Sequence, residues 1–244
     1  MVYRMTVTPM MEEYGKDLRL SPAGILKIFE NAGNRHAAAV GDSLSECLER
    51  GEAWLLTDWY VEIYTRVPMG PEVRVETFCR KGERTAAMLR EFRMRDDEGN
   101  LIALSTSKWA RVDMESKRLI GVDEDTLDRY DAIPSSVFGQ IPPPVRHGKL
   151  PVFNCVDIPV RRSDFDLYEH VHNLEYLDYA FEAIPKEAYS SHATRAFHIT
   201  YIKPITAGQA VRAKCAEIEN GYAVFIEADG ELCATVDLWM NQIL

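Results

Sequence analysis

The chain has 244 residues, of which 46% are hydrophobic and 27% are charged, and its formal net charge is −10. This is the composition of an ordinary soluble globular protein with one or two domains. The acidic balance excludes general nucleic-acid binding, which needs a broad basic surface.

No targeting or anchoring segment is evident. The first nine residues lack the apolar run of a signal peptide, and no later stretch is apolar for long enough to cross a bilayer. The five cysteines are scattered, with neither zinc-ligand spacing nor a disulfide framework. We therefore expect a cytoplasmic protein with no membrane span, no bound metal and no cofactor.

A long helix is predicted early in the chain. Ser21 and Pro22 form a typical helix start, and Gly41 is a typical stop. Residues between them recur at helical spacing: Ile25, Leu26, Ile28, Phe29, Ala32, His36 and Ala39. Four strand patterns follow, at residues 54–64, 73–78, 86–95 and 101–112.

The second half repeats this order after a proline-rich stretch. Residues 135–153 have the proline density of an extended linker. A helix is then predicted from the spacing of Leu174, Leu177, Ala180, Phe181 and Ile184, and it ends before Pro185. The strand patterns that follow lie at residues 196–202, 210–217, 222–228 and 232–240.

Ordered matches between the halves indicate a tandem duplication. Gly70 recurs as Gly208, and each glycine is followed three residues later by Val-Arg, at an offset of 138. Trp109 and Trp239 each follow a turn and close a half, at an offset of 130. We predict an α+β protein in which two antiparallel sheets each wrap around a long helix. The predicted domains are residues 1–134 and 154–244, joined by the linker.

Acids and histidines are crowded just before the second helix. Residues 164–176 contain four acids and two histidines: Asp164, Asp166, Glu169, Glu175, His170 and His172. Carboxylates and imidazoles beside a helix start can perform acid/base chemistry, and the free N–H groups there stabilise anions. The alternative interpretation is a polar loop capped by Asn173 with solvated charges, and the spacing alone does not choose between the two.

The chain resembles the acyl-acyl-carrier-protein (acyl-ACP) thioesterases of plants and bacteria, which have a tandem "double hotdog" fold. The resemblance rests on an ordered set of segments: Gly51 to Leu56, Val73 to Phe78, Leu89 to Phe92, Arg95 to Gly99, Ser107 to Asp113 and Lys117-Arg118. It covers nearly the whole chain. It implies that the second half carries the active site and that the first half has lost chemistry and helps to hold the acyl chain.

The family's active-site pattern, Asp-x-Asp-x-Asn-x-His-Val-Asn-Asn-x-x-Tyr, matches the chain in part. The matching residues are Asp164, Asp166, His170, Val171, Asn173 and Tyr176. Tyr168 and His172 stand where the family has asparagine, and Pro204 stands where a catalytic glutamate is expected. Ile205 occupies the position of a plant cysteine, so a thiol mechanism is excluded for lack of a thiol.

Thioester hydrolysis can be assigned to the residues that remain. We expect Asp166 to act as base or nucleophile, and His170 to orient water or protonate the leaving sulfur. The amides near Val171, His172 and Asn173 would polarise the carbonyl. Tyr168 is either a hydrogen-bond donor in this set or a wall residue that fills space.

Candidate substrate contacts are aromatic and basic residues. Trp54, Trp59 and Tyr176 are expected to contact the acyl chain, although such side chains are usually plain core. Five basic residues are candidates for docking acyl carrier protein or the phosphates of acyl-CoA: Arg161, Arg162, Arg195, Lys203 and Arg212.

Two other functions remain open. Asp166 precedes Tyr176 by ten positions, as in acyl-CoA thioesterases of the 4-hydroxybenzoyl-CoA type. The missing glutamate and asparagine are also consistent with a hotdog module that binds acyl thioesters without catalysis. Two hotdogs in one chain already supply the pairing that single ones obtain by dimerising, and a further homodimer is left open.

Overall fold

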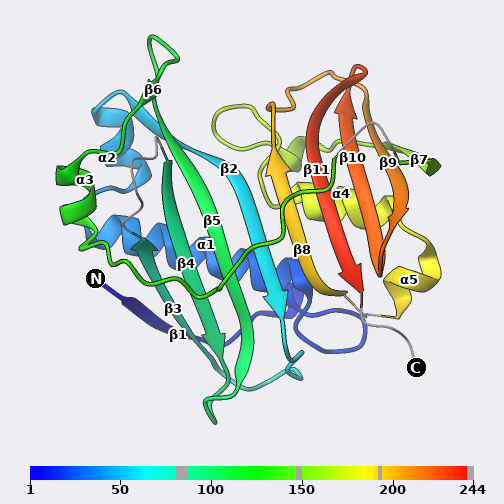
Figure 1. The fold of residues 1–244 in the computed structure, drawn as a ribbon, viewed down its shortest axis with the longest axis horizontal. Coiled ribbons are helices and arrows are strands. Elements are labelled where there is room, and N and C mark those ends of the chain that lie inside the picture. Colours follow the sequence, from blue (N-terminus) through cyan, green and yellow to red (C-terminus); the bar gives the residue numbers. More distant parts are fainter. Residues whose placement is uncertain (81–86, 147–149, 192–193, 241–244) are drawn as a thin grey trace. The chain divides into compact units, whose positions relative to one another are not determined.

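The computed structural model describes residues 1–80, 87–146, 150–191 and 194–240, and it divides into two compact units, Met1–Ile141 and Pro142–Leu244. The boundary lies within the segment predicted as a linker. Each unit contains one antiparallel sheet and one principal helix (Figure 1). No described helix is long and apolar enough to serve as a membrane span.

Unit 1 is built on a sheet with strand order β1-β3-β4-β5-β2, and a short strand, β6, pairs with the far end of β5. All of these neighbours are antiparallel. The bounds of the elements are β1 Tyr3–Val7, η1 Met11–Glu13, α1 Pro22–Ala39, α2 Leu44–Glu49, β2 Glu52–Ile63, β3 Val73–Arg80, β4 Ala87–Arg95, β5 Leu101–Asp113, β6 Leu119–Ile120 and α3 Glu124–Arg129.

The helix α1 begins and ends as the sequence predicts. The Ser21 hydroxyl accepts a hydrogen bond from the Gly24 N–H at 2.9 Å, and Gly41 adopts a φ of +72° just beyond the helix. Its apolar stripe is buried against the sheet, where Phe29 lies 5.0 Å from Phe92 between ring centroids. Ala39, which shares the predicted spacing, is exposed because the helix ends there.

Gly24 in α1 is required by a close approach rather than by a turn. A Cβ at this position would lie 2.1 Å from the carbonyl oxygen of Glu13, whereas a Cβ at Gly33 would meet only side chains, Arg90 at 3.4 Å and Phe92 at 3.7 Å. In a helix interior, glycine to alanine ordinarily stabilises by up to ~1 kcal/mol. Replacement by alanine should therefore destabilise the protein at Gly24 but not at Gly33.

We expect Gly24→Ala to lower the free energy of unfolding by ~1–3 kcal/mol, because the η1 backbone must move away. Gly33→Ala, in the same helix, is the matched control and should be neutral or stabilising. Urea denaturation followed by circular dichroism measures both. Equal effects of the two substitutions would contradict the steric explanation.

Unit 2 repeats the plan with strand order β8-β11-β10-β9-β7, again antiparallel throughout. Its principal helix, α4, packs against β7, β9, β10 and β11. The bounds are β7 Val152–Ile158, η2 Arg162–Asp164, α4 Glu175–Ala183, α5 Lys186–Ser190, β8 Thr194–Tyr201, β9 Val211–Ile218, β10 Gly221–Ala228 and β11 Glu231–Met240.

The predicted helices and strands are confirmed with small shifts at their ends, but three strands, β1, β6 and β7, and the short helices α2, α3 and α5 were missed. β1 was not assigned from the sequence, and β7 begins at Val152, inside the predicted linker. The predicted strand start at residue 86 and part of the linker, residues 147–149, lie outside the described residues.

The duplication extends to individual hydrogen bonds. Four backbone bonds within residues 10–21 recur 151 positions later, within residues 161–172. In unit 1 the bonds run from Glu13 N to Met10 O, Gly15 N to Arg19 O, Leu18 N to Gly15 O and Ser21 N to Glu13 O. Their equivalents in unit 2, in the same order, run from Asp164 N to Arg161 O, Asp166 N to His170 O, Glu169 N to Asp166 O and His172 N to Asp164 O. Leu18 and Glu169 both have positive φ, at 57° and 61°. The loop before each helix is thus one conformation used twice.

Candidate active site

The acid- and histidine-rich segment of unit 2 folds back on itself before α4. Phe165 pairs with Val171 in an antiparallel bridge, and the Asp166 N–H donates to the His170 carbonyl at 2.8 Å. Residues opposite each other in such a ribbon project from the same face. Asp166 and His170 therefore share the face opposite to Val171, which is buried in the core.

The Asp166 carboxylate is fixed by the loop that carries it. Its Oδ1 accepts hydrogen bonds from the backbone N–H groups of Tyr168, at 2.8 Å, and His170, at 3.1 Å. Its Oδ2 has no hydrogen-bond partner among the residues that the structure describes. The side chain is half-buried. One oxygen therefore orients the carboxylate, and the other makes no hydrogen bond within the described residues.

Asp164, the first acid of the segment, is a structural anchor. Its side chain is 1% exposed and accepts hydrogen bonds from the Tyr179 hydroxyl at 2.7 Å, the Arg161 N–H at 2.9 Å and the Arg161 Nε at 2.8 Å. Burial opposes its charge, but the Arg161 and Tyr179 donors outweigh this effect and lower the pKa of Asp164. Asp164 thus fixes η2 against α4 and is fully occupied in doing so.

A neighbouring acid has the opposite shift. Glu175, in the first turn of α4, pairs with the Arg161 Nη2 at 3.1 Å. Burial and the nearby Asp164 charge raise the pKa of Glu175. The sequence pattern did not distinguish these two acids from Asp166.

Two of the expected oxyanion donors are already engaged. The Val171 N–H donates to the Ile205 carbonyl at 2.9 Å, and the His172 N–H donates to the Asp164 carbonyl at 2.7 Å. By contrast, the Asn173 N–H has no protein acceptor within the described part of the chain. The Asn173 carbonyl accepts from the Tyr201 hydroxyl at 2.9 Å, which fixes the peptide plane that follows. Asn173 does not cap α4, because the helix begins after Leu174.

Tyr168 and His172 replace the family's asparagines with larger side chains. Tyr168 is half-buried, and its phenolic oxygen is buried. His172 Nδ1 accepts a hydrogen bond from the Leu174 N–H at 3.4 Å, so the proton of a neutral His172 ring lies on Nε2. Pro204, in place of the expected glutamate, lies in the exposed segment after β8.

Of the aromatic residues predicted to contact substrate, Trp59 and Tyr176 lie in the core and Trp54 is partly buried against it. Trp59 is fully buried, and its indole N–H donates to the Ser105 hydroxyl at 2.8 Å. The Trp54 indole donates to Asp42 Oδ2 at 2.8 Å. Tyr176 is 2% exposed and packs edge-on against Tyr201. These contacts are those of ordinary core aromatics.

Most of the basic residues predicted to dock a partner are paired within unit 2. Arg161 binds Asp164 and Glu175, Lys203 binds Glu231 at 2.6 Å, and Arg212 binds Asp157 at 2.8 Å. Arg162 and Arg195 are exposed and have no ion-pair partner among the described residues. Fewer unpaired basic residues are therefore available for docking a partner on unit 2 than the five that the sequence suggested.

Unit 1 has the same loop with different residues at the candidate catalytic positions. Gly15 occupies the position of Asp166, and Arg19 occupies that of His170. Asp17, the acid of this loop, is paired with Arg66 at 2.6 Å. His36 is fully buried and hydrogen-bonded to Arg90 at 2.8 Å; burial and the Arg90 charge lower the pKa of His36 to about 3. Within the described residues, no group of three or more His, Cys, Asp or Glu side chains could hold a metal ion.

Solved structures with the same architecture establish the fold. The 12:0-ACP thioesterase from Umbellularia californica matches with a TM-score of 0.87 at 19% identity, over 98% of this chain and 97% of that chain. An acyl-ACP thioesterase from Bacteroides thetaiotaomicron matches with a TM-score of 0.87 at 17% identity, over 98% of each chain. The protein is a tandem double hotdog, which confirms the predicted fold class.

The sequence assigns the family. Family models for the acyl-ACP thioesterase N-terminal and C-terminal domains match residues 1–130 and 149–237. The chain therefore belongs to the acyl-ACP thioesterase family, as the sequence resemblance indicated.

Curated relatives are similar over most of this chain. Oleoyl-acyl carrier protein thioesterase 1 of Arabidopsis thaliana, a chloroplastic protein, is 24% identical over 205 residues, which are 78% of this chain and 56% of that protein. The dodecanoyl-[acyl-carrier-protein] hydrolase of Umbellularia californica is 24% identical over 236 residues, 87% of this chain and 59% of that protein. The chain thus spans little more than half the length of these relatives.

Proposed function

We propose that the chain hydrolyses fatty acyl-ACP to a free fatty acid and holo-ACP, with Asp166 as the central catalytic group. Family membership supports the substrate class. The observation that carries the chemistry is the Asp166 carboxylate, which is oriented by two backbone amides through Oδ1 and leaves Oδ2 open on the face it shares with His170. A carboxylate held in this way is suited to accept a proton from an attacking water.

The proposed reaction has two steps. Water attacks the thioester carbonyl carbon while Asp166 Oδ2 takes a water proton, and the carbonyl oxygen becomes an oxyanion. The oxyanion then re-forms the carbonyl as the carbon–sulfur bond breaks and the thiolate leaves. His170 orients the water and then relays the proton held by Asp166 to the leaving sulfur, which restores the Asp166 carboxylate. Thiolate is a good leaving group, so this small set of residues meets the demands of the reaction.

The oxyanion donor in this proposal is Asn173. Its N–H has no protein acceptor in the described chain, whereas those of Val171 and His172 are committed to Ile205 and Asp164. An N–H group fixed before the substrate arrives stabilises the oxyanion without reorganisation. Tyr168 closes the side of the site as a wall residue, consistent with its buried phenolic oxygen.

Unit 1 has a different proposed role. Its copy of the loop carries Gly15 and Arg19 in place of the catalytic pair, so this half is non-catalytic. We assign it to holding the acyl chain, as the family resemblance implies. Trp54 and Trp59 contribute to such a role through the packing of the sheet.

Thiol release tests the function. Acyl-ACP and acyl-CoA substrates of increasing chain length are offered to the purified chain, and free thiol is measured continuously. We expect turnover of acyl-ACP at a higher kcat/KM than of acyl-CoA. Turnover of acyl-CoA alone would favour an enzyme of the 4-hydroxybenzoyl-CoA type. Binding without turnover at any chain length would identify a non-catalytic acyl-thioester-binding module.

A further inference from the structure

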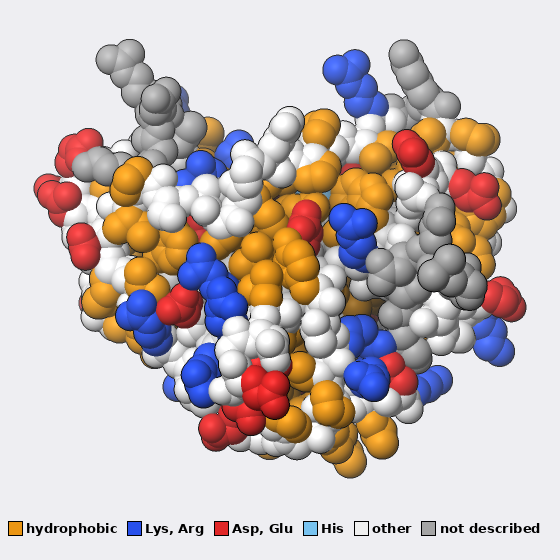
Figure 2. All heavy atoms as spheres, turned by 60° about the horizontal axis from the view of Figure 1, so that its bottom comes forward, with side chains coloured by type: hydrophobic (Ala, Val, Ile, Leu, Met, Phe, Trp, Pro, Cys, Tyr) orange, Lys and Arg blue, Asp and Glu red, His pale blue; other side chains and the backbone are white. Residues whose placement is uncertain are grey.

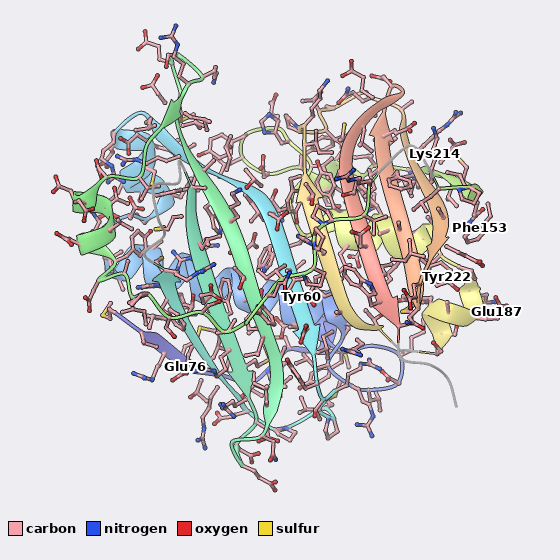
Figure 3. The ribbon with its side chains drawn as sticks, in the orientation of Figure 1. Tyr60, Glu76, Phe153, Glu187, Lys214 and Tyr222 are labelled. Carbon is pink, nitrogen blue, oxygen red and sulfur yellow. The ribbon has the colours of Figure 1, made fainter. Side chains whose placement is uncertain are left out.

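A groove lined by arginines lies on unit 1, away from the loop that matches the catalytic one. Its volume is about 430 Å³, and its walls include Arg4, Thr6, Arg74, Glu76, Arg93 and Arg95. Met5 and Val75, the intervening residues of β1 and β3, also border the groove. In β3 the residues that alternate with Arg74 and Glu76, Val73 and Val75, are buried, and β3 packs against α1. The arginines therefore project from the outer face of the sheet. Figure 3 labels Glu76 at the lower left of the molecule, on β3.

The strand register arranges these side chains in two rows across three strands. Arg4 on β1 is opposite Glu76 on β3, which is opposite Arg93 on β4. In the next row, Thr6 is opposite Arg74, which is opposite Arg95. Neighbouring strands lie about 4.8 Å apart, and rows two residues apart are separated by about 6.6–6.8 Å. The register therefore places four guanidinium groups in two rows across three strands.

The internal contacts of the groove orient its charge but neutralise little of it. Glu76 accepts from Arg4 at 2.8 Å and from Arg93 at 2.9 Å. Arg74 donates to the Asp97 carbonyl at 2.7 Å, and Arg95 donates to the Gly99 carbonyl at 2.8 Å. Carbonyl acceptors position a guanidinium without cancelling its charge.

Two of the three acids in the turn beside the groove are held by the turn itself, and the third, Asp97, is exposed. Asp96 and Glu98 bind Asn100, which closes the turn between β4 and β5. The groove lining therefore has four guanidinium groups and one carboxylate in a protein whose net charge is −10. Figure 2 shows Lys and Arg side chains on both sides of the view, interspersed with acidic and hydrophobic ones.

Protection of a sheet edge does not account for this arrangement. A cation on an edge strand discourages pairing with another chain. That explains Arg4, which lies on the edge strand β1, but Arg93 and Arg95 lie on β4, two strands further in. A cationic surface that continues across three strands is complementary in charge to an anionic partner of comparable width.

We infer that this groove docks an acidic helix of the carrier protein that delivers the acyl chain; the inference rests on the proposed function. Carboxylates at positions i and i+4 of a helix are about 5–6 Å apart, close to the separation of the two arginine rows. Arginine binds carboxylates in a bidentate geometry, and opposed charges accelerate encounter. The unit 2 residues first considered for docking are a weaker candidate, because Arg161, Lys203 and Arg212 are paired with their own acids.

The test replaces the two arginines that are bonded only to carbonyls. In the double variant Arg74→Ala and Arg95→Ala, we expect the Kd for holo-ACP, measured by isothermal titration calorimetry at low salt, to rise at least tenfold. The KM for acyl-ACP should rise similarly while kcat is unchanged. Turnover of a carrier-free acyl-pantetheine should not change. The wild-type Kd should weaken with salt, and that of the variant should depend on salt less steeply.

Arg212→Ala is the matched control, because Arg212 is an exposed arginine on a strand of unit 2 and pairs with a single acid. It should leave the Kd for holo-ACP within twofold of wild type. A double variant that binds holo-ACP as tightly as wild type would overturn the docking assignment, and so would an equal loss in Arg212→Ala. The binding measurement requires no turnover. Tight, groove-dependent binding by a wild-type chain that releases no thiol would instead refute the proposed function and leave the docking surface intact.

Discussion

Replacing Asp166 with asparagine is expected to lower kcat for acyl-ACP by about 100- to 10,000-fold, the usual contribution of a positioned general base. The substitution should separate chemistry from structure. An asparagine carbonyl oxygen can still accept from the Tyr168 and His170 N–H groups, as Asp166 Oδ1 does at 2.8 and 3.1 Å. The amide that replaces Oδ2 cannot accept a proton from water. The loop should therefore remain folded while the reaction stops.

Three measurements make this expectation specific. The thermal midpoint of Asp166→Asn should stay close to wild type, and KM should change much less than kcat. Asp157→Asn, which alters an exposed acid of unit 2 paired with Arg212, is the control and should retain full activity. Near-full activity in Asp166→Asn would remove Asp166 from the catalytic role and support the alternative that this segment is a capped polar loop.

Local patterns predicted most of the fold because they reflect local physics. Ser21 and Pro22 predict a helix start wherever the flanking residues permit one, and the observed cap is the hydroxyl of Ser21. The missed strands are short or exposed. β1 has only five residues, although Tyr3 to Val7 alternate apolar and polar side chains, and β7 is mostly exposed along its length.

The candidate site was predictable in its residue types but not in its hydrogen bonds. The order of acids and histidines before α4 is visible in the sequence. Which amide is available depends on Ile205, a residue more than thirty positions away, which accepts the Val171 N–H. The different roles of Asp164 and Asp166 likewise depend on a tertiary contact, because the hydroxyl of Tyr179 in α4 donates to Asp164. The offset of 151 residues between the two loops was not recognised in the sequence. It makes Glu13 equivalent to Asp164 and Gly15 equivalent to Asp166.

Asp42 shows how far the role of one residue can depend on tertiary contacts. It follows Gly41 at the end of α1, and its side chain is 3% exposed. Its carboxylate accepts hydrogen bonds from Trp54 on β2 at 2.8 Å, Tyr130 after α3 at 2.8 Å and Arg129 at 3.2 Å, and it also pairs with Arg50. One carboxylate thus joins four segments of unit 1, and it accounts for Trp54 better than contact with substrate does.

Asp42→Ala should therefore destabilise unit 1 by ~3–5 kcal/mol, because removing one partner of a buried ionic network leaves the others without compensation. Tyr130 is 1% exposed, so its hydroxyl would lose its acceptor with little access to water. Asp42→Asn, which keeps one acceptor oxygen, should cost less, ~1–3 kcal/mol. Urea denaturation followed by tryptophan fluorescence measures the loss, since Trp54, Trp59 and Trp109 all lie in unit 1. Glu49→Ala, an exposed acid at the end of α2, is the control and should stay within ~0.5 kcal/mol of wild type. A loss below ~1 kcal/mol in Asp42→Ala would show that the four segments are held together by apolar packing, with the carboxylate contributing little.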